Sequence, residues 1–226
     1  MCKVLFWDFD GTLSYPNKSF STALYTVLNE NGYEVKKDDA TGFLEKSYSW
    51  KSPEKSYFDK RGEQWWETMY DKIKTFCGDN DINCTDFDGI CAEFKNRLIA
   101  IDNYMLYDDT EKTLEKCVEM GYKNYLITNN YPEIIQNLEK LGIKKYFTDY
   151  VVSSHIGYEK PRTEFFDYAK NIANNPVVGY VIGDNPIADI QGGQAAGYKT
   201  IAVHECKNSD ADYYVENLFD IFSILT

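Results

Sequence analysis

The chain has 226 residues, of which 43% are hydrophobic and 27% charged, a balance typical of globular rather than disordered proteins. Its 36 acidic residues outnumber its 24 lysines and arginines, and the formal net charge of -12 excludes a broad electrostatic mode of nucleic acid binding. No apolar run approaches the roughly 18 residues that a membrane helix needs, and the N-terminus lacks a signal-peptide core, so we expect a cytoplasmic protein.

The first predicted element is a buried strand. Residues 4–9 form a short apolar run that ends in acidic residues and Gly11, which predicts a strand leading into a loop. The following residues, 16–105, lack further strand patterns, and we call them the helical segment. Their apolar residues recur at helical spacing and predict amphipathic helices at 19–31, 63–76 and 86–101. The linkers of this segment are expected at residues 14–17 and 102–107.

The remainder of the chain alternates strands with helices. Further strands are predicted at residues 125–128, 150–153, 177–182 and 200–203, and helices at 110–120, 132–141, 162–173 and 187–196. This alternation predicts an α/β fold with a Rossmann-like, mainly parallel sheet and helices on both faces. We expect residues 1–15 and 106–226 to form this core and residues 16–105 to form an inserted, all-helical domain.

Two pairs of acidic residues follow predicted strands. Asp8 and Asp10 come directly after the first strand, and two residues of extended chain return a side chain to the same face about 6.5 Å away. Asp184 follows a later strand, and Asp189 lies shortly beyond it. Each of these acids also has a structural interpretation, as a loop residue, a helix cap or a first-turn acid stabilised by the helix dipole.

Groups that could bind an anion follow two other segments. Thr128 and Asn129 end a predicted strand, and Lys160 precedes a proline that favours extended backbone. Alone, these are ordinary turn residues and a solvated lysine. In open parallel sheets, however, ligands bind at the carboxyl ends of the strands, where all these groups would meet.

Carboxylates gathered at that edge need compensating charge. Two of them about 4 Å apart repel by about 4 kcal/mol at an effective dielectric constant near 20. Lys160 supplies one positive charge, and a hard divalent cation with oxygen ligands would supply two more. Mg²⁺ suits such a site best, because it takes one or two carboxylates together with phosphate oxygens and water.

Four short motifs, in this order and spacing, resemble those of the haloacid dehalogenase superfamily, and the helical insertion resembles that of its members with a helical cap. The motifs are Asp8-x-Asp10-Gly11-Thr12, Thr128-Asn129, Lys160-Pro161 and Gly183-Asp184-x4-Asp189. The resemblance covers essentially the whole chain. It is specific for the superfamily but says little about the substrate.

The resemblance implies a role for each acid. Asp8 would attack phosphorus and form an aspartyl-phosphate, and Asp10 would be the general acid and later the general base. Mg²⁺ would be held by Asp8, by Asp184 and by the backbone carbonyl of Asp10. Asp189 would orient a lysine or a metal-bound water.

The resemblance also implies a phosphate-binding set. Thr128 and Lys160 would bind the non-bridging oxygens of the phosphoryl group, helped by the backbone N–H groups of Phe9 and Asn129. The presence of Asp10 argues against the dehalogenase and phosphonate-cleaving branches of the superfamily, which lack a second carboxylate at that position.

The function expected is that of a Mg²⁺-dependent phosphomonoester hydrolase acting on a small phosphorylated metabolite, such as a sugar phosphate or a nucleotide. A phosphomutase is the alternative within the superfamily. A metal-dependent glycosyltransferase and a non-catalytic phosphate-binding protein are the less favoured alternatives from other classes. The sequence does not indicate an oligomeric state.

Basic and aromatic residues alternate within the helical segment. Some of them could bind a charged or planar part of a substrate. Neighbouring acids neutralise the run, however, which for most of these residues favours a solvated surface for the charged side chains and a core position for the aromatic ones. The residues are Lys46, Tyr48, Trp50, Lys51, Lys55, Tyr57, Phe58, Lys60 and Arg61. The pair Trp65 and Trp66 is expected in the core of the segment. The six cysteines are expected to be free thiols, and a structural zinc site is not expected.

Overall fold

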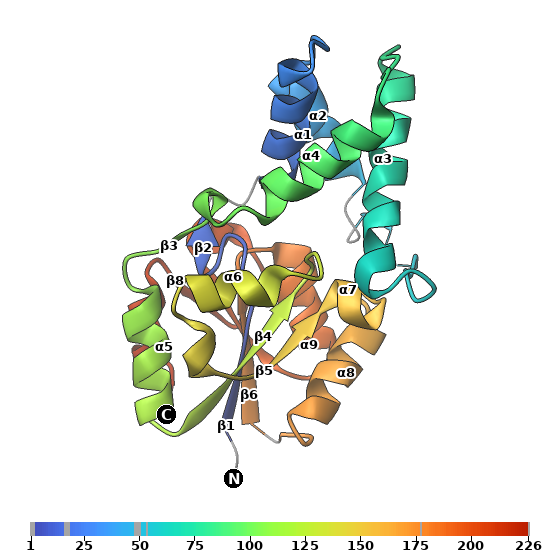
Figure 1. Ribbon diagram of the computed structural model, residues 1–226. Helices are drawn as coiled ribbons and strands as arrows, with labels where there is room; N and C mark the ends of the chain where they lie inside the picture. The colour runs from blue at the N-terminus through green and yellow to red at the C-terminus, as the bar shows by residue number, and fades with distance from the viewer. Residues whose placement is uncertain (1–2, 16–18, 48–50, 53, 177, 226) are drawn as a thin grey trace.

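The computed structural model describes residues 3–15, 19–47, 51–52, 54–176 and 178–225. Its centre is a six-stranded parallel sheet in the order β5-β4-β1-β6-β7-β8 (Figure 1). The strands are β1 (Lys3–Trp7), β4 (Tyr122–Thr128), β5 (Phe147–Val152), β6 (Val178–Gly183), β7 (Lys199–Val203) and β8 (Tyr213–Val215). The predicted α/β fold with a Rossmann-like parallel sheet is confirmed.

Helices cover both faces of this sheet. Side chains of β1 alternate between the faces, so that Leu5 and Trp7 join one hydrophobic cluster while Val4 and Phe6 join another. Helices α5 and α6 pack in the first cluster and α8 in the second. The core helices are α5 (Thr110–Glu119), α6 (Ile134–Lys140), α7 (Ser153–Ile156), α8 (Thr163–Ile172) and α9 (Gly192–Ala195). The central strands are buried on both sides, which explains their continuous apolar runs.

The helical segment lies beyond the carboxyl ends of the central strands (Figure 1). Its helices are α1 (Ser19–Glu30), α2 (Lys37–Lys46), α3 (Trp65–Asp79) and α4 (Phe87–Ile99). Both of its connections to the sheet run through a small antiparallel ribbon of β2 (Ser14–Tyr15) and β3 (Met105–Leu106). The ribbon falls within the expected linkers, and the division into two domains stays a prediction.

Short helical turns complete the chain. The single-turn and irregular helices are η2 (Gly62–Gln64), η3 (Ile101–Asn103), η4 (Lys144–Tyr146), η5 (Pro186–Gln191), η6 (Cys206–Asn208) and η7 (Leu218–Ser223). The helix predicted at 187–196 is divided into the π-helix η5 and α9. Asn185 caps η5, because its Oδ1 accepts from the N–H groups of Ile187 and Ala188 at 3.0 and 2.8 Å.

Several short elements were not predicted, among them α2 and β8. Helix α2 buries only Ala40 and Leu44, too few apolar residues for a clear helical period. Strand β8 has three residues at the edge of the sheet, and only Val215 is fully buried. Short elements with little buried surface leave a weak pattern in the sequence.

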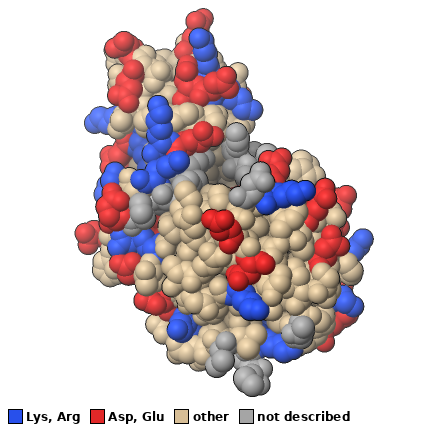
Figure 2. Space-filling view, turned by 180° about the vertical axis from the view of Figure 1, so that it is seen from behind, with Lys and Arg blue, Asp and Glu red and all other residues tan. Residues whose placement is uncertain are grey.

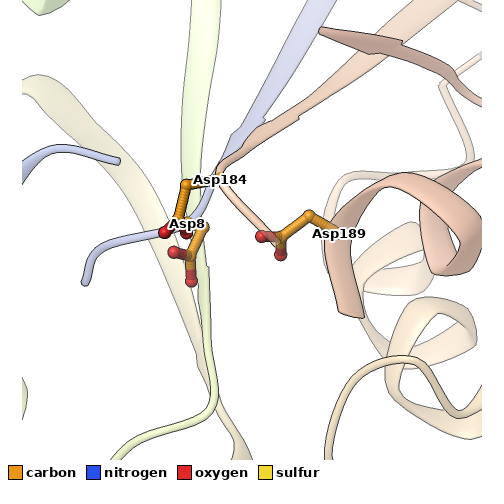
Figure 3. A group of neighbouring side chains, drawn as sticks. All are labelled: Asp8, Asp184 and Asp189. Atoms are coloured by element: carbon orange, nitrogen blue, oxygen red, sulfur yellow. The ribbon is translucent and has the colours of Figure 1, made fainter. Parts of the chain in front are cut away.

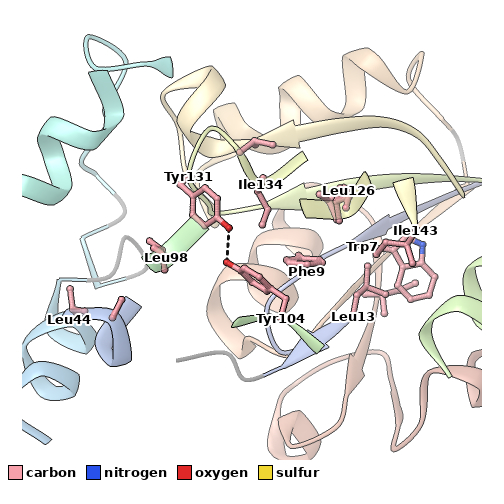
Figure 4. Packing of buried hydrophobic residues seen from close by; sticks show 14 of the residues in the cluster. Trp7, Phe9, Leu13, Leu44, Leu98, Tyr104, Leu126, Tyr131, Ile134 and Ile143 are labelled. Atoms are coloured by element: carbon pink, nitrogen blue, oxygen red, sulfur yellow. Dashed lines mark hydrogen bonds between the residues drawn. The ribbon is translucent and has the colours of Figure 1, made fainter. Parts of the chain in front are cut away.

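Aromatic residues join the helical segment to the sheet. The hydroxyl of Tyr131 donates to that of Tyr104 at 2.9 Å, within the cluster that also holds Phe9 (Figure 4). Trp65 and Trp66 are buried as expected, but Trp66 also stacks on Tyr131 with ring centres 5.8 Å apart. The expected core of the helical segment is therefore continuous with the core of the sheet.

The cysteines that the structure describes form no disulfides, as expected. Cys77, Cys84, Cys91, Cys117 and Cys206 are free thiols, and Cys2 lies outside the described residues. Among the helices that the structure describes, none is long and apolar enough to cross a membrane.

Candidate functional site

Three strand ends meet at the centre of the sheet. The register places Trp7 of β1 opposite Leu126 of β4 and Ile182 of β6. The chain continues in register, because the N–H of Asp8 donates to the carbonyl of Ile182 at 3.0 Å. The residues that follow β1 and β6 therefore lie beside the end of β4, which is Thr128.

Three of the predicted acids form a cluster at this point. Each of Asp8, Asp184 and Asp189 offers a carboxylate oxygen, and these oxygens lie within 4.8 Å of one another (Figure 3). Asp8 and Asp189 are buried and Asp184 is half-buried. Residues separated by most of the chain thus meet because β1 and β6 are neighbours in the sheet.

Lys160 lies between two of these acids. Its Nζ donates to Oδ1 of Asp8 at 2.7 Å and to Oδ1 of Asp189 at 2.6 Å, and its side chain is 2% exposed. Burial acts to lower the pKa of Lys160, but the Asp189 and Asp8 carboxylates outweigh it and raise that pKa. The lysine is therefore a fixed ammonium that partly neutralises the cluster.

Asn129 positions this lysine through its backbone. The N–H of Lys160 donates to Oδ1 of Asn129 at 2.7 Å, and Nδ2 of Asn129 donates to the carbonyl of Lys160 at 3.0 Å. This reciprocal pair joins the loop after β4 to the loop before α8. Sequence reasoning assigned Asn129 to phosphate binding through its backbone and missed this role of its side chain.

The remaining oxygens of the buried acids are also held. The hydroxyl of Thr12 donates to Oδ2 of Asp8 at 3.2 Å, and the N–H of Asn185 donates to Oδ2 of Asp189 at 3.0 Å. A side chain at Gly183 would collide with Asp189, since an added Cβ would lie 2.3 Å from its Cγ. The glycine before Asp184 is therefore required for the close approach of the two segments.

Asp10 lies outside the three-acid cluster. Its Oδ2 accepts from Nδ2 of Asn130 at 2.6 Å, while its Oδ1 is enclosed without a hydrogen-bond partner among the described residues. Burial, and after it the charge of Asp8, raise the pKa of Asp10 to about 7. The same Asn130 amide lies 3.4 Å from Oγ1 of Thr128, so it ties the two side chains together.

A pocket of about 250 Å³ opens onto these residues. Its sheet side includes Asp8, Asp10, Thr128, Asn129, Lys160, Asp184 and Asp189. The structure thus gathers every predicted site residue along one cavity. The opposite wall comes from α1, α2 and α3 of the helical segment and includes Phe20, Leu44, Glu45, Ser47, Trp65, Met69 and Lys72.

The basic residues singled out in the sequence do not line this pocket within the described part of the chain. Lys46, Lys51, Lys55 and Arg61 are exposed, and acidic and basic side chains alternate over the surface of the helical segment (Figure 2). Tyr48 and Trp50 lie outside the described residues. Among the described residues of the helical segment, Lys72 is the lysine that lines the pocket, and no sequence signal distinguished it from surface lysines.

The three-acid cluster fits a divalent metal ion. Three carboxylates and one ammonium leave two negative charges, and all the donors are hard oxygens. Both oxygens of Asp8 and both oxygens of Asp189 accept hydrogen bonds, and each acid gives one of them to Lys160. The half-buried Asp184 and the facing oxygens of these two neighbours are the groups that could hold a metal.

Comparison with known proteins agrees with the fold and the motifs. Residues 4–203 match the family model described as haloacid dehalogenase-like hydrolase. Glyceraldehyde 3-phosphate phosphatase from Methanopyrus kandleri is 32% identical over 108 residues, which are 47% of this chain and 46% of that protein. The chain therefore spans about half the length of this curated relative. Human haloacid dehalogenase-like hydrolase domain-containing protein 3 is 25% identical over 206 residues, 89% of this chain and 81% of that protein.

A solved structure shares the architecture over nearly its full length. The magnesium-bound HAD-hydrolase YfnB from Bacillus subtilis superimposes with a TM-score of 0.79 at 19% identity, covering 99% of this chain and 98% of that one. At this level of identity the likeness concerns the fold, including the position of the helical segment over the sheet.

Proposed function

The chain belongs to the haloacid dehalogenase-like hydrolase family, and we propose that it is a Mg²⁺-dependent phosphatase that hydrolyses monoesters of small phosphorylated metabolites. One observation carries the proposal. Lys160 holds Asp8 and Asp189 at 2.7 and 2.6 Å at the base of a pocket that Asp10 and Thr128 also line. Phosphoryl transfer depends mainly on such positioning and on charge stabilisation.

Asp8 is the proposed nucleophile. Lys160 and Thr12 each donate to one of its oxygens, which fixes the orientation of the carboxylate. Attack by a carboxylate oxygen on phosphorus forms an aspartyl-phosphate as the bond from phosphorus to the leaving alkoxide breaks. Water then cleaves the aspartyl-phosphate and releases inorganic phosphate.

Asp10 is the proposed general acid and base. Asn130 holds its Oδ2, and its Oδ1 is left available for a proton that passes to the leaving alkoxide. In the second step the same oxygen accepts a proton from the attacking water. Because Asp10 lies two residues after Asp8 on extended chain, both carboxylates face the same pocket.

The other residues of the sheet side bind the phosphoryl group or support its binding. The Thr128 hydroxyl, the Lys160 ammonium and the backbone N–H of Asn129 are proposed to contact the non-bridging oxygens. Asp189 is a positioning residue for Lys160. Asp8, Asp184 and the backbone carbonyl of Asp10 would hold Mg²⁺, which when bound supplies positive charge to the phosphoryl oxygens.

The helical segment is proposed to act as a cap domain, residues 16–105, on a catalytic core of residues 1–15 and 106–226. Its described helices form one wall of the pocket, so a bound leaving group would lie between the two parts. This arrangement excludes water from the reacting bond and places the choice of leaving group with the helical segment.

The test is a screen for phosphate release from a broad panel of phosphomonoesters, with and without Mg²⁺, beside Asp8→Asn. We expect Mg²⁺-dependent turnover by the wild type and a loss of at least about 10⁴-fold in the variant, because the nucleophile is removed. The thermal melting curve of the variant serves as the folding control. Equal phosphate release by both proteins would disprove the assignment of Asp8.

A further inference from the structure

One buried asparagine contacts two of the side chains that line the pocket. Nδ2 of Asn130 donates to Oδ2 of Asp10 at 2.6 Å and lies 3.4 Å from Oγ1 of Thr128. Asn130 is 1% exposed and follows β4, while Asp10 follows the neighbouring strand β1. The parallel sheet thus brings this amide to an acid 120 positions away in the sequence. Asn130 does not itself line the pocket, so it can act there only through residues that do.

The direction of this amide is fixed by the next residue of the chain. Oδ1 of Asn130 accepts from the N–H of Tyr131 at 3.0 Å. A backbone N–H can only donate, so the oxygen of the amide faces Tyr131 and the NH₂ group faces Asp10. Asp10 is therefore the acceptor in its hydrogen bond with Asn130.

The backbone of Asn130 is held as well. Its N–H donates to Oγ of Ser153 at 3.0 Å, and Ser153 is the first residue of α7, directly after β5. Both residues are buried. The amide cannot turn away from Asp10 without breaking hydrogen bonds between buried groups, which is costly when no water replaces them.

The fixed amide gives the two oxygens of Asp10 different tasks. Oδ2 accepts from the amide, whereas Oδ1 has no hydrogen-bond partner among the described residues. The oxygen of a carboxylic acid that does not carry the proton is the better acceptor. The amide therefore directs the proton of the proposed transfer to Oδ1, the oxygen left for the leaving group and the attacking water.

The same amide also directs the hydroxyl of Thr128. An NH₂ group has two hydrogens, which is enough for Asp10 and Thr128 together. When Oγ1 of Thr128 accepts from the amide, its own hydrogen points elsewhere. Thr128 lines the pocket beside Asp8 and Lys160, so this hydrogen can be donated to a phosphoryl oxygen there.

We propose that Asn130 is a positioning residue that orients two groups of the reaction at once, the carboxyl group of Asp10 and the hydroxyl of Thr128. It acts through these side chains and does not touch the substrate. This inference rests on the proposed phosphatase function, and it adds a residue that the four sequence motifs do not include.

The leaving-group dependence of kcat/KM tests the contact with Asp10. Phenyl phosphate and p-nitrophenyl phosphate have similar shapes, but phenolate needs a proton from the acid more than p-nitrophenolate does. Asn130→Leu nearly keeps the volume of the side chain and removes the donor. We expect its kcat/KM for phenyl phosphate to fall about 10-fold more than that for p-nitrophenyl phosphate. In the Asp10→Asn background the same change should leave this ratio unaltered, because the acid that it misplaces is gone.

Inhibition by inorganic phosphate tests the contact with Thr128. Asn130→Leu should raise the inhibition constant about 3- to 10-fold, because the hydroxyl loses its fixed direction. Thr128→Val removes the hydroxyl and should raise the constant at least as much. Adding Asn130→Leu to Thr128→Val should then cause no further rise.

Asn137→Leu is the matched control. Asn137 is also a buried asparagine, and its Nδ2 donates to the hydroxyl of Tyr131 at 2.8 Å. Its loss should lower the melting temperature and change neither the ratio of the two esters nor the inhibition constant. Ser153→Ala is a milder second variant, which removes the acceptor of the Asn130 N–H. It should shift both measurements in the same direction as Asn130→Leu, by about 2- to 3-fold.

The outcomes distinguish this inference from the proposed function. If the wild type releases phosphate from no ester, the two aryl phosphates included, the phosphatase function is wrong. If the wild type is active but Asn130→Leu lowers kcat/KM equally for both esters and leaves the inhibition constant unchanged, the inference alone is wrong, since a purely structural asparagine would give that result. A change in one measurement only would overturn the role at the other side chain. Ser153→Ala decides in the same way if Asn130→Leu does not fold.

Discussion

The side chains on the two walls of the pocket differ in how deeply they are buried and in how many hydrogen bonds hold them. On the sheet side, Thr128, Lys160 and Asp189 are 1%, 2% and 1% exposed, and both Asp189 oxygens accept hydrogen bonds. On the helical side, Glu45 is exposed and Lys72 is half-buried, with a backbone carbonyl as its hydrogen-bond acceptor. One wall is a buried network of charged groups, and the other is formed by longer side chains on helix surfaces.

This difference is what the proposed function requires of each wall. A group that stabilises charge on phosphorus must be fixed in place before the substrate arrives, since reorientation during the reaction costs catalytic rate. A group that binds a leaving group has to match one molecule, and helix-borne side chains can be exchanged without disturbing the sheet. Changes on the sheet side should therefore affect every substrate, and changes on the helical side should affect only some.

After Asp8→Asn, the largest effect is expected for Asp10→Asn. Loss of general acid catalysis should lower kcat for alkyl phosphates about 10²- to 10⁴-fold, because an alkoxide leaves poorly without a proton. The loss should be smaller for p-nitrophenyl phosphate, whose leaving group is stable as an anion. Steady-state kinetics on both types of ester measure this, and equal losses for the two would contradict a role in proton transfer.

Lys160→Met comes next, because it breaks a buried ion pair and removes a group that is proposed to bind the phosphate. We expect kcat to fall about 10²- to 10³-fold for all esters, and the free energy of unfolding to fall by about 3–5 kcal/mol. In the variant, Asp8 and Asp189 stay buried but lose the ammonium that lies within 2.7 Å of each in the wild type. Urea unfolding in the absence of divalent cations measures the second effect.

A double variant separates stability from catalysis at this position. Adding Asp189→Asn to Lys160→Met removes one of the two stranded charges and should restore part of the lost stability. The same change should restore no activity, because the ammonium that is proposed to bind the phosphate is still missing. Recovery of both together would show that Lys160 acts only through folding.

The sheet side could be predicted from the sequence because short loops follow its strands. Asp8 and Asp184 each come directly after a buried strand, so the parallel topology alone brings them to one edge. The contacts between loops could not be predicted in the same way. The pairing of Asn129 with the backbone of Lys160 joins residues 31 apart and depends on how two turns pack.

The helical side was less predictable because helix surfaces look alike in sequence. Lys72 and Lys74 both lie on α3, yet one lines the pocket and the other faces solvent. Only the packing of α3 over the sheet distinguishes them, and that packing depends on contacts distant in sequence. The amphipathic period predicts that the apolar face of a helix packs against the protein. It does not predict which of the polar residues beside that face will line a pocket.

Gly157→Ala examines the junction between the two walls. Gly157 has φ of +81°, and an added Cβ would lie 2.5 Å from Cα of Phe58, which belongs to the helical segment. The N–H of Tyr57 also donates to the carbonyl of Gly157 at 2.8 Å. We expect a loss of about 1–3 kcal/mol in the free energy of unfolding, and a rise in KM because the turn leads to Glu159.

Gly142→Ala is the matched control for this variant. Gly142 has a similar φ of +77°, but an added Cβ would meet nothing within 4 Å. This variant should lose only the unfolding free energy that a positive φ costs an alanine, and its KM should be unchanged. If urea unfolding and KM respond alike in both variants, the contact with Phe58 contributes nothing to the junction.

The smallest effect is expected for Glu133→Gln, which weakens a second junction. Glu133 lies just before α6 and accepts from Nε1 of Trp66 at 3.2 Å and from Nζ of Lys95 at 3.0 Å, both in the helical segment. The pair is partly exposed, so losing its charge should cost about 1 kcal/mol or less, and less still at high salt. Glu139→Gln, whose partner Lys144 lies in the same part of the fold and whose side chain is 69% exposed, should cost still less. Thermal melting at low and high salt compares the two. A loss at Glu133 that salt does not reduce would contradict the assignment of the effect to its charge, since glutamine can still accept from Trp66.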